Sequence, residues 1–139
     1  MIKRKKKIFL IISTVFILLG GIYATTYIPK KIISIEPSKV SKIEIFDGNR
    51  GEPLTVIDTK QKEHIISNLN NITFKKEKLS IGYLGYKFRV TIYNDKGKVY
   101  KELIINNTEK IRYKGFFYTD KSKSIAFDYI NNLFLTMKQ

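Results

Sequence analysis

The stretch "YKFRVTIYNDKGKVYKELIIN", from Tyr86 to Asn106, decides the fold. Its first half alternates large apolar residues with polar ones, which is the period-two pattern of a half-buried β-strand. The segment "NDKG" is a turn signal, and the apolar pattern resumes after it at Val99, Leu103 and Ile105. We therefore expect an antiparallel hairpin here, with a sheet built around it.

Further strands are expected on both sides of this hairpin. The stretch "VSKIEIFDGNRGEPLTVID" predicts strands at Val40–Phe46 and Leu54–Ile57, joined by a turn at Asp47-Gly48-Asn49. "ITFKKEK" predicts an edge strand whose lysines discourage the addition of another strand. "KIRYKGFFYTD" predicts a shorter hairpin that folds at Lys114-Gly115.

Two segments have helical periodicity. In "DTKQKEHIISNLNNI", Asp58 or Thr59 can cap a helix, and its apolar positions are Ile65, Ile66, Leu69 and Ile72. In "DKSKSIAFDYINNLFLTMK", Asp120 or Ser122 is expected as the cap, and the apolar stripe is Ala126, Tyr129, Ile130, Leu133 and Met137. The predicted fold class is α+β, an antiparallel sheet covered on one face by one or two helices.

The chain begins with five cations at positions 3–7, followed by an uncharged run of 21 residues from Ile8 to Ile28. A helix of that length is about 31 Å long, which matches the hydrocarbon core of a bilayer. A cleaved signal peptide is the alternative, but the bulky Ile22 two residues before Ala24 makes a poor cleavage site. We expect a transmembrane anchor with its N-terminus in the cytoplasm, and its core residues are Ile8, Phe9, Leu10, Phe16, Leu18, Leu19 and Ile22.

The predicted organisation has four parts. Residues 1–7 form a basic cytoplasmic tail, residues 8–28 the transmembrane anchor, residues 29–38 a linker, and residues 39–139 an extracytoplasmic α+β domain. The linker "PKKIISIEPS" contains two prolines and little periodicity. A flexible linker of this length reaches about 20 Å, so any partner is expected close to the membrane.

The composition limits the possible partners. The formal net charge is +14, but only four of the 26 basic residues are Arg, the residue that usually reads phosphates and bases. Two explanations stay open, a compositional bias toward Lys or a surface selected to bind anions. Nucleic acid is not expected outside the membrane, and the absence of Cys excludes disulfides and thiolate metal sites.

No catalytic or metal-binding pattern is present in the sequence. "DGNRGE" begins like a calcium-binding loop, but its sixth position is Glu52 rather than Gly and its twelfth is Asp58 rather than Glu. His64 is the only histidine and is expected to be a solvated helix residue. The 12 carboxylates are scattered among lysines. The prediction is therefore a protein that is not an enzyme and has neither a cofactor nor a metal.

The stretch "SIGYLGYKF" contains the strongest candidate for partner binding. Gly82 and Gly85 allow the backbone to bend, and Tyr83, Leu84 and Tyr86 are large side chains beside that bend. The alternative is that these three side chains pack against the end of the sheet. Exposure of Tyr83 and Leu84 is the expected sign of a binding loop.

The basic N-terminus, the single span and the compact α+β domain resemble small single-span or lipoprotein-like extracytoplasmic proteins of low-GC Gram-positive bacteria, several of which carry a domain of unknown function. "VSKIEIFDGNRGE" and "IRYKGFFYTD" are the most recognisable stretches, although the lipidated Cys of a lipoprotein is missing. The expected function is a membrane-anchored binding module that docks a protein or an anionic polymer of the cell envelope. The alternative is a surface immunity or inhibitor protein against a toxin or a cell-wall hydrolase.

Overall fold

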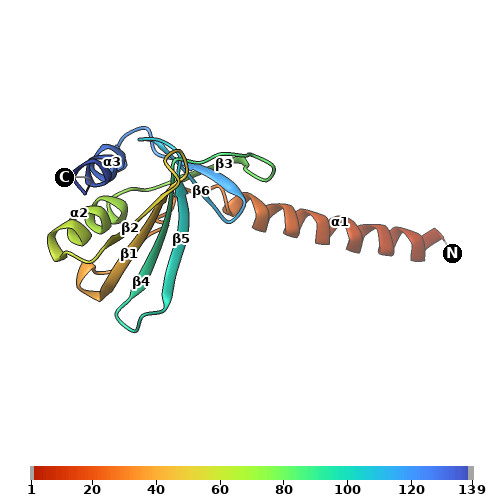
Figure 1. Cartoon of the computed structure of the whole chain (residues 1–139). Helices are drawn as coiled ribbons and strands as arrows, with labels where there is room; N and C mark the ends of the chain where they lie inside the picture. Colours follow the sequence, from red (N-terminus) through yellow and green to blue (C-terminus); the bar gives the residue numbers. More distant parts are fainter. Residues whose placement is uncertain (1, 138–139) are drawn as a thin grey trace.

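The computed structural model describes residues 2–137 and has an α+β fold (Figure 1). It begins with an apolar helix, continues with a seven-stranded antiparallel sheet, and contains two further α-helices and a short 3₁₀ helix. In chain order the elements are α1 (Ile2–Thr25), η1 (Pro37–Lys39), β1 (Val40–Asp47), β2 (Glu52–Val56), α2 (Thr59–Asn70), β3 (Lys75–Leu79), β4 (Phe88–Asn94), β5 (Val99–Ile105), β6 (Lys110–Tyr113), β7 (Phe116–Thr119) and α3 (Phe127–Thr136).

The strand order in the sheet is β2-β1-β4-β5-β6-β7-β3. The predicted central hairpin is confirmed, because β4 and β5 pair antiparallel with Phe88 opposite Ile105 and Val90 opposite Leu103. The hairpins β1–β2 and β6–β7 are confirmed as well. The predicted edge strand β3 does lie at the edge of the sheet, where it pairs with β7 alone.

The helix α2 begins as the sequence predicts. The side chain of Asp58 accepts a hydrogen bond from the backbone N–H of Gln61 at 2.9 Å, which satisfies a free donor of the first helical turn. Ile65, Ile66 and Leu69 are the buried residues of the helix.

The predicted start of the C-terminal helix is wrong. α3 begins at Phe127, with Ala126 at the N-cap and no side-chain capping bond. Asp120 instead accepts hydrogen bonds from the backbone and hydroxyl groups of Ser122, which close a separate local turn before the helix. The predicted stripe also needs correction at its end, because Met137 is exposed whereas Phe134 is buried.

The hydrophobic core joins the sheet to both α2 and α3. Phe88 of β4 is fully buried, and its ring stacks on the ring of Phe134 with centroids 5.7 Å apart and lies 5.2 Å from that of Phe127. Ile43 and Ile45 of β1 are buried in the same cluster as the apolar face of α2. This packing holds β1 and β4 against the two helices.

The segment 29–38, which the sequence predicts to be a linker, packs against the domain. Ile32 and Ile33 are buried in the core. The backbone groups of Lys30 and Phe74 exchange hydrogen bonds of 2.9 and 2.8 Å. The folded part of the chain therefore includes Lys30, and the flexible reach expected of this segment is a wrong prediction.

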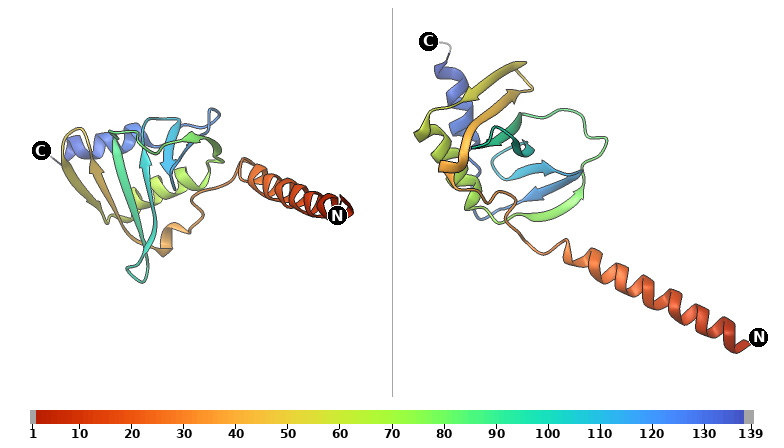
Figure 2. Two further views of the ribbon diagram at one scale, coloured as in Figure 1. Left: turned by 90° about the vertical axis from the view of Figure 1, so that its right-hand side faces the viewer. Right: turned by 90° about the horizontal axis from the view of Figure 1, so that it is seen from below.

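The helix α1 projects away from the domain (Figures 1 and 2). It leaves at the end of the sheet where β3 and the β6–β7 hairpin lie (Figure 1). The turn between β4 and β5 lies at a different corner, away from α1 (Figure 1). The β6–β7 hairpin therefore lies nearer to α1 than the β4–β5 turn does (Figure 1).

Candidate functional site

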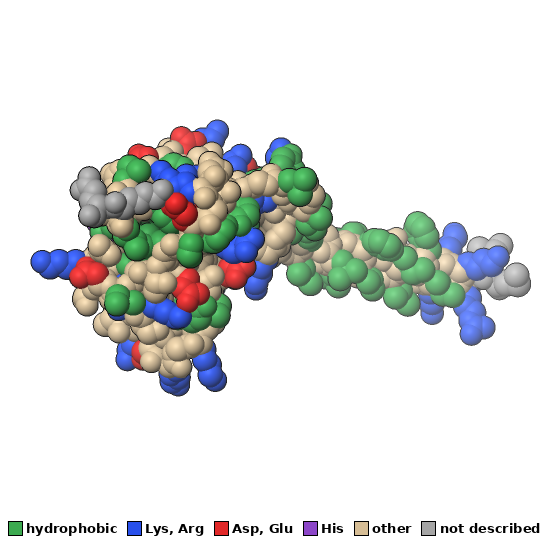
Figure 3. Space-filling model, in the orientation of Figure 1, with side chains coloured by type: hydrophobic (Ala, Val, Ile, Leu, Met, Phe, Trp, Pro, Cys, Tyr) green, Lys and Arg blue, Asp and Glu red, His purple; other side chains and the backbone are tan. Residues whose placement is uncertain are grey.

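The residues Lys3–Thr25 of α1 form a helix of 23 residues with a mean hydropathy of 2.3 in its most apolar window, and none of that window is buried in the protein. Figure 3 shows hydrophobic side chains along its length and basic ones at its far end. This length and composition are compatible with a single membrane span or with a signal sequence. All seven predicted core residues of the anchor are exposed, with exposed fractions from 51% to 73%.

The segment 79–86, which starts at the last residue of β3 and leads toward β4, contains the predicted partner-binding residues, and we call it the apolar loop. Leu84 is 96% exposed and Ile81 is 76% exposed. Gly82 and Gly85 have φ angles of +83° and +79°, so the sharp bends of the loop depend on conformations that other residues adopt only with strain. The loop thus presents aliphatic side chains to the surroundings.

The two tyrosines of the apolar loop are turned toward the domain. The ring of Tyr83, half-exposed, meets Phe117 edge-on with centroids 5.0 Å apart, and its hydroxyl accepts a hydrogen bond of 2.7 Å from Lys78. That hydrogen bond is the main cause that raises the pKa of Lys78. Tyr86 is half-buried, and its backbone oxygen lies so close to Gly48 that a Cβ there would stand 2.5 Å away. The predicted loop residues therefore divide into an exposed tip at Leu84 and tyrosines that contact the sheet.

The sheet has a shallow hollow of about 450 Å³ on the face that carries Glu44, Thr91 and Glu102, which we call the open face. These three residues are direct neighbours across β1, β4 and β5. Thr91 Oγ1 lies 3.5 Å from a carboxylate oxygen of Glu102, and Phe46 and Arg89 also line the hollow. Tyr86 borders this region, since the Arg89 guanidinium lies 4.8 Å from the centroid of its ring.

Glu44 is held as a carboxylate. The hydrogen bond from Lys42, at 2.5 Å, is the main cause that lowers the pKa of Glu44, and the bond from the Tyr93 hydroxyl, at 2.7 Å, lowers it further. A general acid at neutral pH needs a raised pKa, which is the opposite shift. Glu44 therefore gives this hollow a fixed negative charge.

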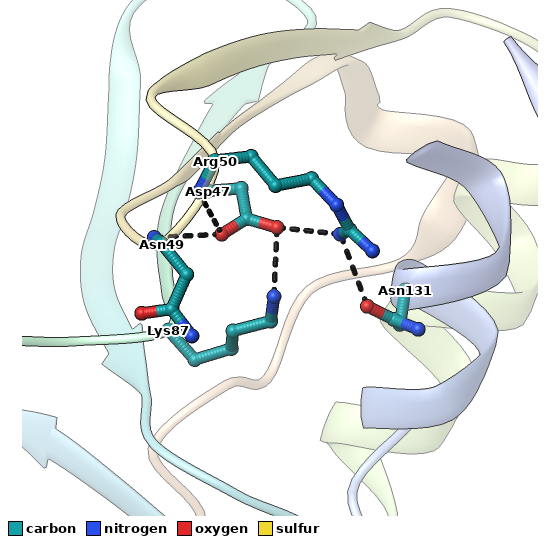
Figure 4. A network of polar contacts seen from close by, with 5 residues as sticks. All are labelled: Asp47, Asn49, Arg50, Lys87 and Asn131. Carbon is teal, nitrogen blue, oxygen red and sulfur yellow. Dashed lines mark hydrogen bonds and ion pairs between the residues drawn. The ribbon is translucent and has the colours of Figure 1, made fainter. Parts of the chain in front are cut away.

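Asp47 forms a buried polar network at the end of β1 (Figure 4). One carboxylate oxygen accepts backbone N–H bonds from Asn49 at 2.9 Å and Arg50 at 3.1 Å, and the other accepts from Arg50 Nη1 at 2.6 Å and Lys87 Nζ at 2.8 Å. Arg50 also donates to Asn131 of α3 at 3.1 Å. Burial raises the pKa of Asp47, but the bonds from Lys87, Arg50 and Asn49 outweigh that effect and lower it. Because its oxygens are all engaged inside the protein, Asp47 joins the β1–β2 turn to β4 and α3.

Lys76 of β3 is a buried cation at the junction with α1. Its Nζ atom donates a hydrogen bond of 3.0 Å to Thr26 Oγ1. The same atom lies 3.7 Å from the centroid of the Phe116 ring, 4.9 Å from that of Tyr27 and 5.1 Å from that of Tyr23. Ring faces attract a cation most strongly where water is displaced, so these contacts hold the end of α1 against the sheet.

The sequence pattern does not reveal the buried contacts of Asp47 and Lys76. It predicts a turn at Asp47, and the further signal is that Asp47 ends a strand three residues before Arg50. The pattern of "ITFKKEK" predicts a lysine-rich edge, but Lys76 is the buried residue of β3, whereas Lys75 and Lys78 are exposed. The register of β3 against β7 shifts between Lys76 and Leu79, so alternation does not separate Lys76 from Lys78 and no local signal singles it out.

His64 lies on the exposed surface of α2, where its ring stacks on that of Tyr129 with centroids 3.8 Å apart. Within residues 2–137, no three His, Cys, Asp or Glu side chains are grouped so that they could hold a metal ion. No protein-family model matches the chain, and neither a curated protein nor a solved structure shows significant similarity to it.

Proposed function

We propose that this chain is a single-span membrane protein, with its N-terminus in the cytoplasm, that holds a non-catalytic binding module outside the membrane. The exposed apolar surface of α1 and the basic residues at its start support the span and its orientation. The contacts between Lys76 and α1 favour retention of the helix over cleavage. Cleavage after Ala24 would remove the Tyr23 ring from Lys76.

In this proposal α2 and α3 cover one face of the sheet and leave the open face for a partner. The ring contacts of Phe88 with Phe127 and Phe134 support this arrangement, because Phe88 and its neighbour Arg89 point to opposite faces of β4. Thr55, Arg89 and Glu102 on the open face are exposed. The uncovered hollow between them is the observation that carries the binding function.

The partner is a protein or an anionic polymer of the cell envelope, and the hollow favours a protein. Glu44 and Glu102 line it together with Arg89, so a polyanion would meet two carboxylates there. A protein surface with charges of both signs fits this arrangement. Tyr83 and Tyr86, among the residues expected to bind a partner, lie at the side of the open face where the apolar loop contacts Phe117 and Arg89.

The proposal is tested by crosslinking whole cells and capturing the full chain as wild type, Arg89→Glu or Lys96→Glu. Both substitutions change the net charge equally, but Lys96 lies in the exposed β4–β5 turn outside the hollow. A partner that binds the open face is captured by the wild type and by Lys96→Glu, and its amount falls at least about tenfold with Arg89→Glu. Equal capture by all three chains would remove the open face as the binding surface.

A further inference from the structure

Among the described residues of the domain, the two most exposed apolar side chains belong to the apolar loop. Leu84 is 96% and Ile81 76% exposed, and Leu79 at the start of the loop is 53% exposed. Single exposed apolar side chains are normal on a protein surface, but several that gather in one short segment mark a surface that contacts another molecule or a membrane. The aromatic ring of Tyr83, which is the type of side chain that anchors most protein partners, is turned back onto Phe117.

The apolar loop lies at the end of the sheet from which α1 departs (Figures 1 and 2). Leu79 at its start pairs with Phe116, and the ring of Phe116 contacts Lys76, which is bonded to Thr26 just beyond α1. Figure 3 shows hydrophobic side chains on the side of the domain that faces α1. The loop and the end of the apolar helix are therefore joined through a short chain of contacts.

The chain between α1 and the folded domain is too short to move the loop far from a bilayer. Helix α1 ends at Thr25, and Lys30 is already paired with Phe74. Five residues span at most about 18 Å when fully extended. A membrane crossed by α1 therefore lies within reach of the apolar loop.

The charges around the loop suit a surface of anionic lipid headgroups. Lys78 and Lys114 are exposed in β3 and in the adjacent β6–β7 turn, beside the loop, and Lys75 is exposed at the start of β3, next to the Phe74 that pairs with Lys30. Glu77, on the same strand, is paired with Lys110 at 3.0 Å. Exposed lysines around an aliphatic tip are typical of segments that rest on membranes, where each cation near an anionic surface adds to binding.

We propose that Ile81 and Leu84 insert into the outer leaflet of the membrane that α1 crosses, while Lys75, Lys78 and Lys114 lie at the level of the lipid phosphates. This inference rests on the proposed function, because it requires α1 to span the membrane. The loop is then a second membrane contact. Together with the Lys76 junction, it fixes which way the open face points.

The test uses a fluorescent label that responds to water, attached to the full chain in vesicles of phosphatidylcholine and phosphatidylglycerol. The chain has no native Cys, so Leu84→Cys provides a unique attachment site and Lys96→Cys the matched control at an exposed turn away from α1. We expect lipids that carry a spin-label quencher to quench the label at position 84 at least about threefold more than the label at position 96.

Extraction with alkaline carbonate separates the two proposals. If the chain stays in the vesicles but the labels at 84 and 96 are quenched equally, the loop does not enter the lipid and the inference is overturned. If the label at 84 is shielded only in native membranes, a protein covers the loop, which also overturns it. If carbonate releases the chain, α1 does not span the membrane, and the proposed function fails together with the inference.

A separate double substitution tests whether the lysines contribute to membrane binding of the loop. Combined Lys78→Gln and Lys114→Gln substitutions leave Ile81 and Leu84 in place, and we expect them to reduce the quenching at position 84 at least twofold in vesicles with phosphatidylglycerol. In vesicles of phosphatidylcholine alone the same substitutions are expected to have no effect. An equal reduction in both lipids would show that these lysines do not contact anionic headgroups.

Discussion

Asp47 and Lys76 are both charged side chains removed from water, with exposed fractions of 0% and 7%, but the protein stabilises them in different ways. Asp47 is surrounded by two cations and two backbone N–H groups, which come from its own turn and from Lys87, the residue just before β4. Lys76 has no carboxylate among its contacts in the described structure and lies instead among aromatic rings and one hydroxyl.

Because their partners differ, Asp47 and Lys76 have different roles in the structure. Every partner of Asp47 lies within the domain, so its network maintains the internal arrangement of the β1–β2 turn, β4 and α3. Three partners of Lys76 belong to α1 or follow it directly, so Lys76 connects the domain to the apolar helix. Changes at Asp47 should therefore affect folding, and changes at Lys76 should affect orientation.

The largest effect is expected from Asp47→Ala, which leaves two cations without their carboxylate. Removing one partner of a buried ion pair usually costs 3–5 kcal/mol, and we expect about 3 kcal/mol because Arg50 and Lys87 reach solvent. The measurement is denaturant unfolding of the full chain in detergent micelles. The control is Lys39→Ala, whose pair with Asp95 is exposed on both sides, and its loss should stay below about 0.5 kcal/mol. Equal losses would contradict a special role for Asp47.

The next effect is expected from Gly48→Ala, in the same turn. A Cβ at Gly48 would stand 2.5 Å from the backbone oxygen of Tyr86, so the chain beside Lys87 must shift. We expect a loss of about 2 kcal/mol in unfolding free energy. The control is Gly51→Ala, which has φ of +68° but open space around it and should cost about 1 kcal/mol from backbone strain alone. A larger loss at Gly51 would show that turn conformation, not contact with Tyr86, decides the stability.

Acid should weaken the Asp47 site. The pKa of Asp47 is lowered in the folded protein, so its stabilising contribution is present above the unfolded pKa of about 3.9 and is lost as the pH falls through the folded value. Glu44 and Asp120 also have lowered pKa values, so the wild type is compared with Asp47→Asn. We expect stability to decline less steeply below pH 4 in the variant. If the stability of the wild type and of Asp47→Asn falls in parallel with pH, Asp47 does not cause the loss of stability in acid.

The smallest effect on stability is expected from Lys76→Met, which keeps the length of the side chain and removes its charge. Because an apolar replacement of a buried charge is often neutral, the unfolding free energy should change by less than about 1 kcal/mol. The orientation of α1 should loosen instead. Spin labels at Ile22→Cys and Ile57→Cys, both exposed positions, should give a broader distance distribution in Lys76→Met than in the control Lys96→Met, which lies in the exposed β4–β5 turn. A distribution as narrow as that of the control would show that Lys76 does not fix the helix.

Local patterns were sufficient to predict most elements. The alternation around Phe88 and Val90 predicted β4 because one face of that strand is buried, and the Asp58 cap predicted the start of α2 because its partner Gln61 lies three residues away. The start of α3 was wrong because Asp120 and Ser122 bond to each other in a local turn instead of to the helix. The packing of Ile32 and Ile33 was missed because a ten-residue segment with two prolines has no period to reveal its buried side.

The sequence by itself determined the length and apolarity of α1, the α+β class and the hairpins, since these depend on residues that are neighbours in the chain. Only the tertiary structure decided which polar residues meet. Asp47 contacts Lys87, 40 positions away, Lys76 contacts Thr26, 50 positions away, and Arg50 contacts Asn131, 81 positions away. Such pairs depend on strand order and on how helices pack, which no local pattern encodes. The placement of the apolar loop at the same end of the sheet as α1 is a result of the same kind.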